Sequence, residues 1–380
     1  MSVIRHVFQD FVIVDNRIWF SNNTMNGLFS ANPESGQTEL VRIFPGEKLF
    51  QCRLYTKVYV YNNRLVFIPY CAENISVYNI LNDSFIQIET PISKKERMWS
   101  SFITVQWENK IFLFNDHMQD MAVLDVNDCI IRMCPIPMRN KISVFLEMPI
   151  RCVVDDCAYI VQDNLLITVK MSSNQVFVRE IAEAGVRFAG IQYGRDRFWI
   201  IDCENKLYAY RDEDNMAEKK LERMQADWNK SPSTVKDFFL NGQNIWVLLD
   251  RQNYLIHLNI FTMESDIILY ENGDRLRNSI LEYSCYDSQK QRIQILRRGE
   301  ARHRILDLDK GKWSTIIYET PWEEIKEVYQ ENLKQCDYFM IESLICEGLD
   351  TIRLFTDIQE ATKDLNNEKS CGKEIFQYLA

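Results

Sequence analysis

Glycine and histidine are scarce in this chain of 380 residues. The 12 glycines amount to about 3% of the residues, where roughly 7% is usual. This scarcity argues against glycine-dependent phosphate loops and leaves the turns to asparagine and aspartate. The 4 histidines and 11 cysteines have no metal-site spacing, because the closest cysteine pairs have four intervening residues rather than two. We therefore expect no bound metal and no cofactor.

Membrane and secretion segments are also missing from the sequence. No stretch approaches the roughly 18 consecutive apolar residues of a membrane-spanning helix. The first ten residues contain no apolar run that ends in a small-residue cleavage site. We expect no membrane span, reduced cysteines and a cytoplasmic location. The net charge of -10 argues against nucleic acid as a partner.

A repeated pattern of strands runs through most of the chain. Seven segments each combine an alternating apolar strand, an Asn/Asp turn and a second β-rich strand, which predicts a hairpin. A third strand follows each hairpin, and its last residues are spaced 47, 46, 45, 41, 48 and 48 positions apart. A fourth strand is evident in six repeats. The fifth repeat has the weakest pattern, near residues 216–224, and this region is either a strand or partly a helix. The third strands end at Asn32, Asn79, Asp125, Lys170, Arg211, Asn259 and Asp307.

Four strands per repeat, a period near 46 and seven repeats predict an all-β fold, a seven-bladed β-propeller over residues 8–320. The chain resembles the broad propeller superfamily, and its period is similar to that of kelch-like and quinoprotein-like repeats. It carries no family signature: neither the double glycine of kelch repeats, nor the Trp-Asp ending of WD repeats, nor the aspartate box of sialidases. The resemblance therefore implies a fold and leaves the function open, because propellers serve unrelated functions.

Residues 321–380 form a distinct, acidic and mostly helical C-terminal extension. They hold thirteen acidic and six basic residues, a balance of −7. Trp322, Ile325 and Leu333 share one stripe with Val328 or Tyr329, which predicts an amphipathic helix. A strand at residues 337–342 and a helix near residues 350–363 are expected to follow. Either that strand or the N-terminus closes the ring of blades.

The last residues of the chain are a candidate docking segment. Ile375, Phe376 and Leu379 lie on one predicted helical face after a polar linker at residues 366–370. Such a face suits a hydrophobic groove of a partner. The alternative is that this segment packs back on the propeller, since short isolated helices are marginally stable.

The loops between blades repeatedly place a basic residue beside a large apolar one. Arginine and tryptophan at loop tips suit the recognition of carboxylates, phosphates or sugar faces. The alternative is that the aromatic residues fill gaps between blades while the basic residues are solvated. The candidate ligand-binding residues are Lys48, Phe50, Arg97, Trp99, Arg139, Arg187, Trp228 and Arg277.

Two further regularities are interpreted as structural. An Asn or Asp stands just before the third strand in six blades, and turn chemistry explains this better than ligand binding. Trp19, Trp199 and Trp246 occupy equivalent strand positions, so we expect them to be buried between blades. The Asn/Asp positions are Asn26, Asn74, Asp120, Asn164, Asn205 and Asn253.

The leading functional hypothesis is a non-enzymatic binding or scaffold propeller. Its loop face would recognise a protein partner or an anionic or glycan ligand, and we assign no catalytic residue. The alternative is a propeller lyase or glycosidase that acts on a saccharide in a central pocket. It would use loop carboxylates such as Asp163, Asp202 and Glu204, with His117 as a candidate base.

Deletion of residues 366–380 tests the docking-segment hypothesis. If this segment is a docking tail, its removal leaves the melting temperature nearly unchanged, because no core packing is lost. Thermal unfolding of the full and shortened chains measures this. A loss of several degrees would instead make the segment part of the folded body.

Overall fold

The structure is a computed structural model of the chain. It describes residues 3–49, 53–93, 102–115, 120–136, 151–211, 222–223, 235–249, 252, 254–269, 281–287, 289–297 and 302–333. Within these ranges the chain forms seven four-stranded antiparallel sheets, one two-stranded sheet and one helix. The prediction of a seven-bladed β-propeller is confirmed.

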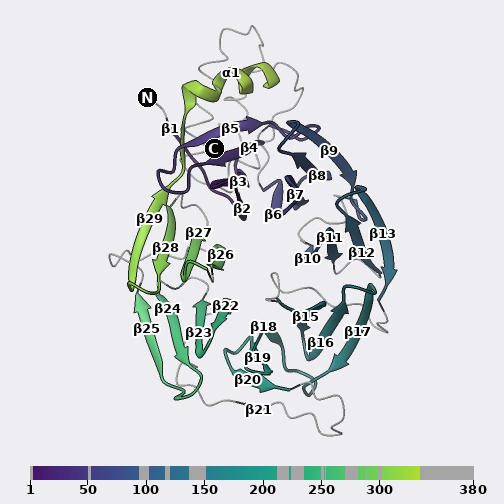
Figure 1. Cartoon of the computed structure of the whole chain (residues 1–380), viewed down its shortest axis with the longest axis vertical. Coiled ribbons are helices and arrows are strands. Elements are labelled where there is room, and N and C mark those ends of the chain that lie inside the picture. Colours follow the sequence, from purple (N-terminus) through teal and green to yellow (C-terminus); the bar gives the residue numbers. More distant parts are fainter. Residues whose placement is uncertain are drawn as a thin grey trace, which may run out of the picture. The chain divides into compact units, whose positions relative to one another are not determined.

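Each blade uses four strands that are consecutive in sequence (Figure 1). Blade 1 contains β2 (Phe11–Val14), β3 (Arg17–Ser21), β4 (Leu28–Ala31) and β5 (Thr38–Arg42); blade 2 contains β6 (Tyr55–Tyr61), β7 (Arg64–Pro69), β8 (Asn74–Asn79) and β9 (Ser84–Glu89). Blade 3 contains β10 (Ile103–Trp107), β11 (Lys110–Phe114), β12 (Asp120–Asp125) and β13 (Ile130–Pro135); blade 4 contains β14 (Arg151–Val154), β15 (Cys157–Gln162), β16 (Leu165–Lys170) and β17 (Gln175–Glu180). Blade 5 contains β18 (Phe188–Gly194), β19 (Arg197–Asp202), β20 (Leu207–Tyr210) and β21 (Glu222–Arg223); blade 6 contains β22 (Val235–Asn241), β23 (Asn244–Leu249), β24 (Tyr254–Asn259) and β25 (Ser265–Leu269). Blade 7 contains β26 (Leu281–Asp287), β27 (Arg292–Arg297), β28 (Arg302–Asp307) and β29 (Lys312–Ile317).

The chain divides into two compact units. The first comprises Met1–Met98, Leu296–Arg304 and Ser314–Ala380, and the second comprises Trp99–Ile295 and Ile305–Trp313. Blades 1 and 2 belong to the first unit, and blades 3 to 6 belong to the second.

Tight turns without glycine join the first two strands of several blades. The turn residues Asp15 and Asn16 have φ angles of 51° and 58°, and Asn62 and Asn63 have φ angles of 45° and 59°. A two-residue hairpin turn with positive φ at both positions matches the twist of the flanking strands. Asparagine and aspartate tolerate this left-handed conformation better than other non-glycine residues. The glycine-poor sequence therefore still closes its hairpins.

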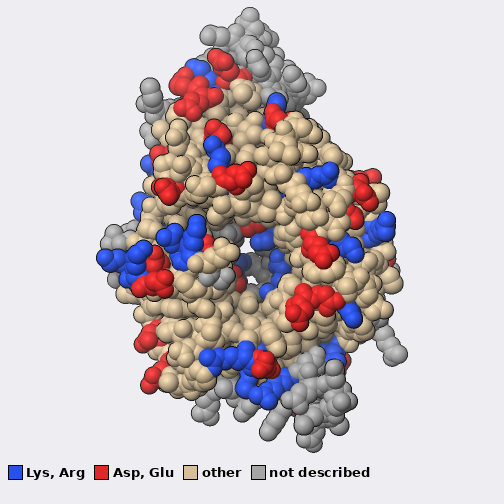
Figure 2. Space-filling view, viewed as in Figure 1, with Lys and Arg blue, Asp and Glu red and all other residues tan. Residues whose placement is uncertain are grey.

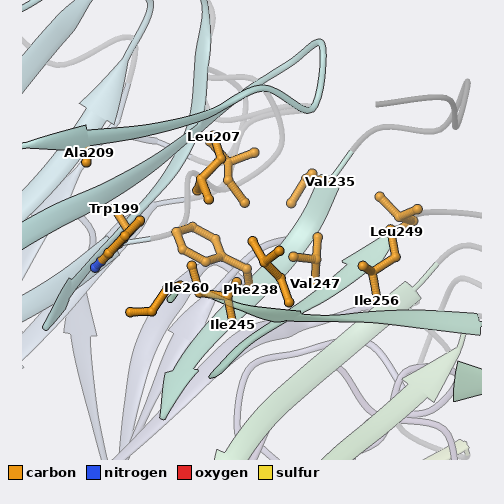
Figure 3. Packing of buried hydrophobic residues seen from close by; sticks show 12 residues of the cluster. Trp199, Leu207, Ala209, Val235, Phe238, Ile245, Val247, Leu249, Ile256 and Ile260 are labelled. Carbon is orange, nitrogen blue, oxygen red and sulfur yellow. The ribbon is translucent and has the colours of Figure 1, made fainter. Parts of the chain in front are cut away.

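The hydrophobic core lies between the faces of neighbouring blades. One cluster combines Trp199 of blade 5 with Phe238 and Ile256 of blade 6 (Figure 3). Trp19 and Trp246 belong to two other such clusters, and all three tryptophans are buried. The expectation that these equivalent tryptophans are core residues is confirmed.

The fourth strand of blade 5 is described over two residues. The sequence left this region open as partly helical, but the structure has a strand of two residues, β21. Its residues Glu222 and Arg223 pair with Ala209 and Tyr208 of β20. Within the described residues, β21 therefore pairs with β20 at two positions.

The two ends of the described chain meet in the first unit. β1 (Val3–Arg5) pairs antiparallel with β30 (Glu319–Pro321). The helix α1 (Trp322–Leu333) follows at once, as predicted, and buries Trp322, Ile325 and Tyr329. The Tyr329 hydroxyl donates to the backbone oxygen of Asn26 at 2.6 Å. The strand expected at residues 337–342 and the helix expected near 350–363 lie outside the described residues.

A chain of buried hydrogen bonds joins this strand pair to blade 1. The Asn22 amide nitrogen donates to Nδ1 of His6 at 2.8 Å, because the amide oxygen already accepts from the Thr24 backbone N–H. His6 must therefore carry its proton on Nε2, which lies 2.8 Å from the Thr320 hydroxyl. That hydroxyl donates to the Thr38 carbonyl at 2.8 Å. The network requires a neutral histidine, and burial lowers the pKa of His6 to about 3.

His303 is a second buried histidine in the same unit. Its Nδ1 atom lies 3.2 Å from the Tyr318 hydroxyl, and its ring meets Phe8 and Phe11 edge to face. Burial lowers the pKa of His303 to about 4. The first unit therefore contains two imidazoles that stay neutral where an exposed histidine would be protonated.

Stability should fall as the pH falls below 6.5. The unfolded chain then binds protons that folded His6 and His303 exclude, so the free energy of unfolding drops by about 1.4 kcal/mol per pH unit for each histidine, down toward pH 4. Above pH 6.5 this contribution is fully present. Urea unfolding at pH 7.5, 6 and 5 measures the slope.

The variants His6→Gln and His303→Gln should each reduce the dependence of the free energy of unfolding on pH by about 1.4 kcal/mol per pH unit. His257→Gln is the comparison variant and should flatten the slope less, because His257 is only partly buried and Asp266 opposes the lowering of its pKa by burial. Parallel losses in the wild type and in both variants would contradict the assignment of the slope to these two residues.

Candidate functional site

Two of the eight loop-face candidates lie in the described part of the chain. Lys48 is exposed next to the buried Leu49, and Arg187 is exposed just before β18. Lys48 lies in the first unit and Arg187 in the second. The other six candidates, the tail residues and His117 lie outside the described residues: Phe50, Arg97, Trp99, Arg139, Trp228, Arg277, Ile375, Phe376, Leu379 and His117.

Arg187 lies in an ion pair between the loops of blades 4 and 5. Its Nε atom is 3.8 Å from a carboxylate oxygen of Asp163. The backbone also links these loops, because Phe188 N–H donates to the Asp163 carbonyl at 3.0 Å and Cys203 N–H donates to the Arg187 carbonyl at 2.8 Å. Burial raises the pKa of the Cys203 thiol, so this cysteine is not an activated nucleophile. An anionic ligand would have to compete with Asp163 for the guanidinium.

The asparagines before the third strands fix the path of the chain after the fourth strand. The Asn26 amide donates to the carbonyls of Phe44 and Glu47 at 2.9 and 3.0 Å, and its oxygen accepts from Phe44 N–H at 2.9 Å. In blade 4, Asn164 donates to the Ala182 carbonyl at 3.0 Å. These bonds support the structural interpretation of the repeated Asn/Asp positions.

Asp202, one of the carboxylates considered for glycoside chemistry, organises its own loop. It is buried and accepts from the backbone N–H groups of Glu204 and Lys206 at 2.9 and 2.8 Å. The Tyr208 hydroxyl also donates to it at 2.8 Å. The three hydrogen bonds therefore give this carboxylate a structural role in holding the loop.

The described histidines are equally engaged in the body of the protein. His6 and His303 are buried, and His257 stacks on Trp246 with ring centroids 4.3 Å apart. Nε2 of His257 lies 2.9 Å from the Asn244 side-chain oxygen. Among the described residues no group of three or more His, Cys, Asp or Glu side chains could hold a metal ion. The same part of the chain contains no helix that could cross a membrane.

Large apolar side chains are exposed on the fourth strands of several blades. Ile267 and Leu269 of β25 are the most exposed of these, at 65% and 63%. Figure 1 shows β13, β17 and β25 at the outer side of their sheets. The other exposed members are Ile86 of β9, Ile130 and Met133 of β13, and Phe177 of β17.

Blades 4 and 6 differ at equivalent positions of their fourth strands. Val178 pairs with Ile167 in blade 4, and Ile267 pairs with Ile256 at the equivalent position of blade 6. Val178 packs against the core that blade 4 shares with blade 3. Ile267 lies on the side of its sheet that faces blade 5, yet it is 65% exposed. Its apolar surface is therefore available for contact.

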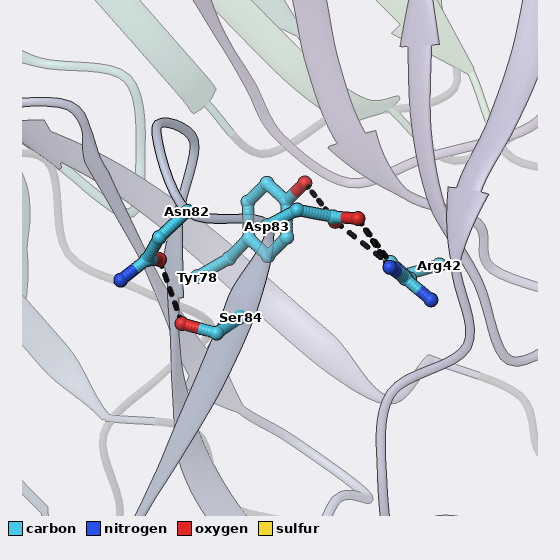
Figure 4. A network of polar contacts seen from close by, with 5 residues as sticks. All are labelled: Arg42, Tyr78, Asn82, Asp83 and Ser84. Atoms are coloured by element: carbon cyan, nitrogen blue, oxygen red, sulfur yellow. Dashed lines mark hydrogen bonds and ion pairs between the residues drawn. The ribbon is translucent and has the colours of Figure 1, made fainter.

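Blades 1 and 2 also carry polar contacts at their fourth strands. Arg42 of β5 binds the Asp83 carboxylate in the turn before β9, with Nε 3.0 Å from each oxygen (Figure 4). The Tyr78 hydroxyl donates to the same carboxylate at 2.7 Å, and Asn82 binds Ser84 beside it. The Arg42 bonds lower the pKa of Asp83 to about 2. Polar contacts thus link the outer strands of these two blades.

Charge is mixed in sign on the face shown in Figure 2, where the acidic and basic side chains of the described residues lie in small groups.

No family model matches the chain, and no curated protein matches its sequence significantly. In fold it is similar to a catalytically inactive virginiamycin B lyase from Staphylococcus aureus, solved with quinupristin, with a TM-score of 0.56 and 12% identity over 78% of this chain and 95% of that chain. It is also similar to the computationally designed Ika8 protein, with a TM-score of 0.53 and 9% identity over 82% and 86% of the two chains. A third similar structure is PorZ, a surface component of the type-IX secretion system of Porphyromonas gingivalis, with a TM-score of 0.51 and 13% identity over 84% of this chain and 38% of that one. At these identities the likeness shows the fold alone.

The variant Asn26→Ala tests the structural role of the repeated asparagines. It leaves the buried backbone groups of Phe44 and Glu47 without their side-chain partner, so the free energy of unfolding should fall by about 1–3 kcal/mol. Asn82→Ala is the matched control, because the Asn82 side chain bonds the exposed Ser84 and should cost less than about 0.5 kcal/mol. Equal stability of the two variants in urea unfolding would contradict this role.

Proposed function

We propose that this chain is a non-enzymatic binding propeller that recognises a protein partner. The observation that carries the proposal is the exposed apolar surface on the fourth strands, above all Ile267 and Leu269 of blade 6. Fully burying an isoleucine or leucine side chain contributes about 1.5–3 kcal/mol. A partner that covers this surface therefore gains affinity from residues that do not stabilise the isolated propeller.

The polar groups of the described residues favour binding over catalysis. Asp202 and the histidines His6, His257 and His303 all make bonds that hold loops, strands or the end of the chain in place. A general acid or base needs free access to the substrate proton it transfers. The likeness to a lyase is a likeness of fold, and one fold supports many chemistries.

A protein is also the better candidate than an anionic or glycan ligand. Of the basic loop residues that suggested such a ligand, Arg187 is engaged by Asp163. The apolar residues of the fourth strands match the apolar anchors of protein interfaces more closely than the polar groups of a sugar.

The test is reconstitution of a defined complex. The tagged chain is purified under mild conditions from cells that express it, and the captured protein is then produced separately and remixed with it. Native mass spectrometry should show a complex of fixed stoichiometry that forms again from the pure components. A chain that is recovered alone and that turns over members of an oligosaccharide panel would refute the proposal and favour the enzyme.

A further inference from the structure

β25 is the edge strand of blade 6 among the described residues, so half of its backbone groups point away from the sheet. Asn259 N–H donates to the Glu264 carbonyl at 3.0 Å, which sets the phase of the β24–β25 ladder. Because antiparallel pairs alternate, the backbone groups of Asp266 and Ile268 point toward β24. Those of Ser265, Ile267 and Leu269 point away from it, toward the outer edge.

A contact at one end of this edge supports that assignment. The indole N–H of Trp313 donates to the Leu269 carbonyl at 3.1 Å. An edge carbonyl of β25 thus accepts a hydrogen bond from outside blade 6. Ser265 and Ile267 present the remaining outward groups, and a row of such groups is a template for an added strand.

The side chains of β25 specify what kind of strand fits. Ile267 and Leu269 expose apolar surface on the side of the sheet that faces blade 5. Asp266 points to the opposite side and is 83% exposed, and Glu264 just before β25 is also exposed. An added strand therefore meets apolar side chains on one side and carboxylates on the other. Its own residues should alternate between apolar and basic.

A second copy of this chain fits the edge less well. Symmetric pairing centred on Ile267 would place Ser265 opposite Leu269 and would compete with both Trp313 hydrogen bonds. It would also bring together two chains that each carry a net charge of -10. A basic partner strand avoids the charge repulsion and needs only the part of the edge before Leu269.

We propose that β25 binds an extended strand of a partner protein in which apolar and basic residues alternate. This inference rests on the proposed function and adds its surface and the chemistry of its partner. Main-chain hydrogen bonds to Ser265 and Ile267 align the strand. Apolar contacts with Ile267 and Leu269 and charge pairing with Asp266 select its sequence.

Two labelled peptides test the proposal by fluorescence polarisation with the full chain. One has the sequence Lys-Val-Lys-Val-Lys-Val-Lys, and the other has glutamate in place of each lysine. The lysine peptide should bind at least tenfold more tightly than the glutamate peptide. Hydrogen exchange should show that it slows exchange of the Ser265 and Ile267 amides more than that of amides in β17.

The variant Ile267→Pro removes an outward N–H and leaves the bonds between β24 and β25 intact, because proline is tolerated on an edge strand where the N–H faces outward. It should weaken binding of the lysine peptide at least tenfold. Ile267→Thr with Leu269→Thr is the second variant, in case proline disturbs folding. Phe177→Thr, on the fourth strand of blade 4, is the matched control and should leave affinity unchanged.

The outcomes separate this inference from the proposed function. Equal affinity of the lysine peptide for the wild type and for both β25 variants overturns the inference. Concentration-dependent dimers that Ile267→Pro abolishes also overturn it, because the occupant is then a second copy. If the reconstituted partner complex survives both β25 variants, the inference fails while the proposed function stands.

Discussion

Packing of each blade against the face of the next is the interaction on which this structure depends. A single four-stranded sheet cannot bury its own apolar faces, so the side chains of neighbouring blades must share a core. In the second unit, Trp199 of blade 5 meets Phe238 of blade 6 in such a core, and blades 3 and 4 share another. The length of each strand then decides how far that shared core extends toward the outer edge.

Several polar residues of the described chain support this packing. Asn26 and Asn164 hold the chain where it leaves the fourth strand, and Asp202 holds a loop. The His6 network connects the β1–β30 pair to blade 1 through bonds that require a neutral ring. These bonds hold loops, strands and a chain end in place within each unit.

Blades 4 and 6 differ at their fourth strands. The equivalent residues Val178 and Ile267 are both apolar, yet Val178 packs against a core and Ile267 is exposed. Both residues lie on the side of their sheet that faces the preceding blade. The candidate interaction surface therefore consists of ordinary strand residues whose exposure only the fold shows.

The sequence by itself determined the number of blades, the ends of the third strands to within one residue, the burial of the three equivalent tryptophans and the helix that starts at Trp322, because these follow from local alternation and a regular period. It also predicted the fourth strand of blade 6 but not its exposed surface, because Ile267 and Leu269 look like ordinary strand residues until their surroundings are known. It did not show that Asp163 lies beside Arg187. Burial, pairing and exposure depend on residues far apart in the chain, so only the tertiary structure could decide them.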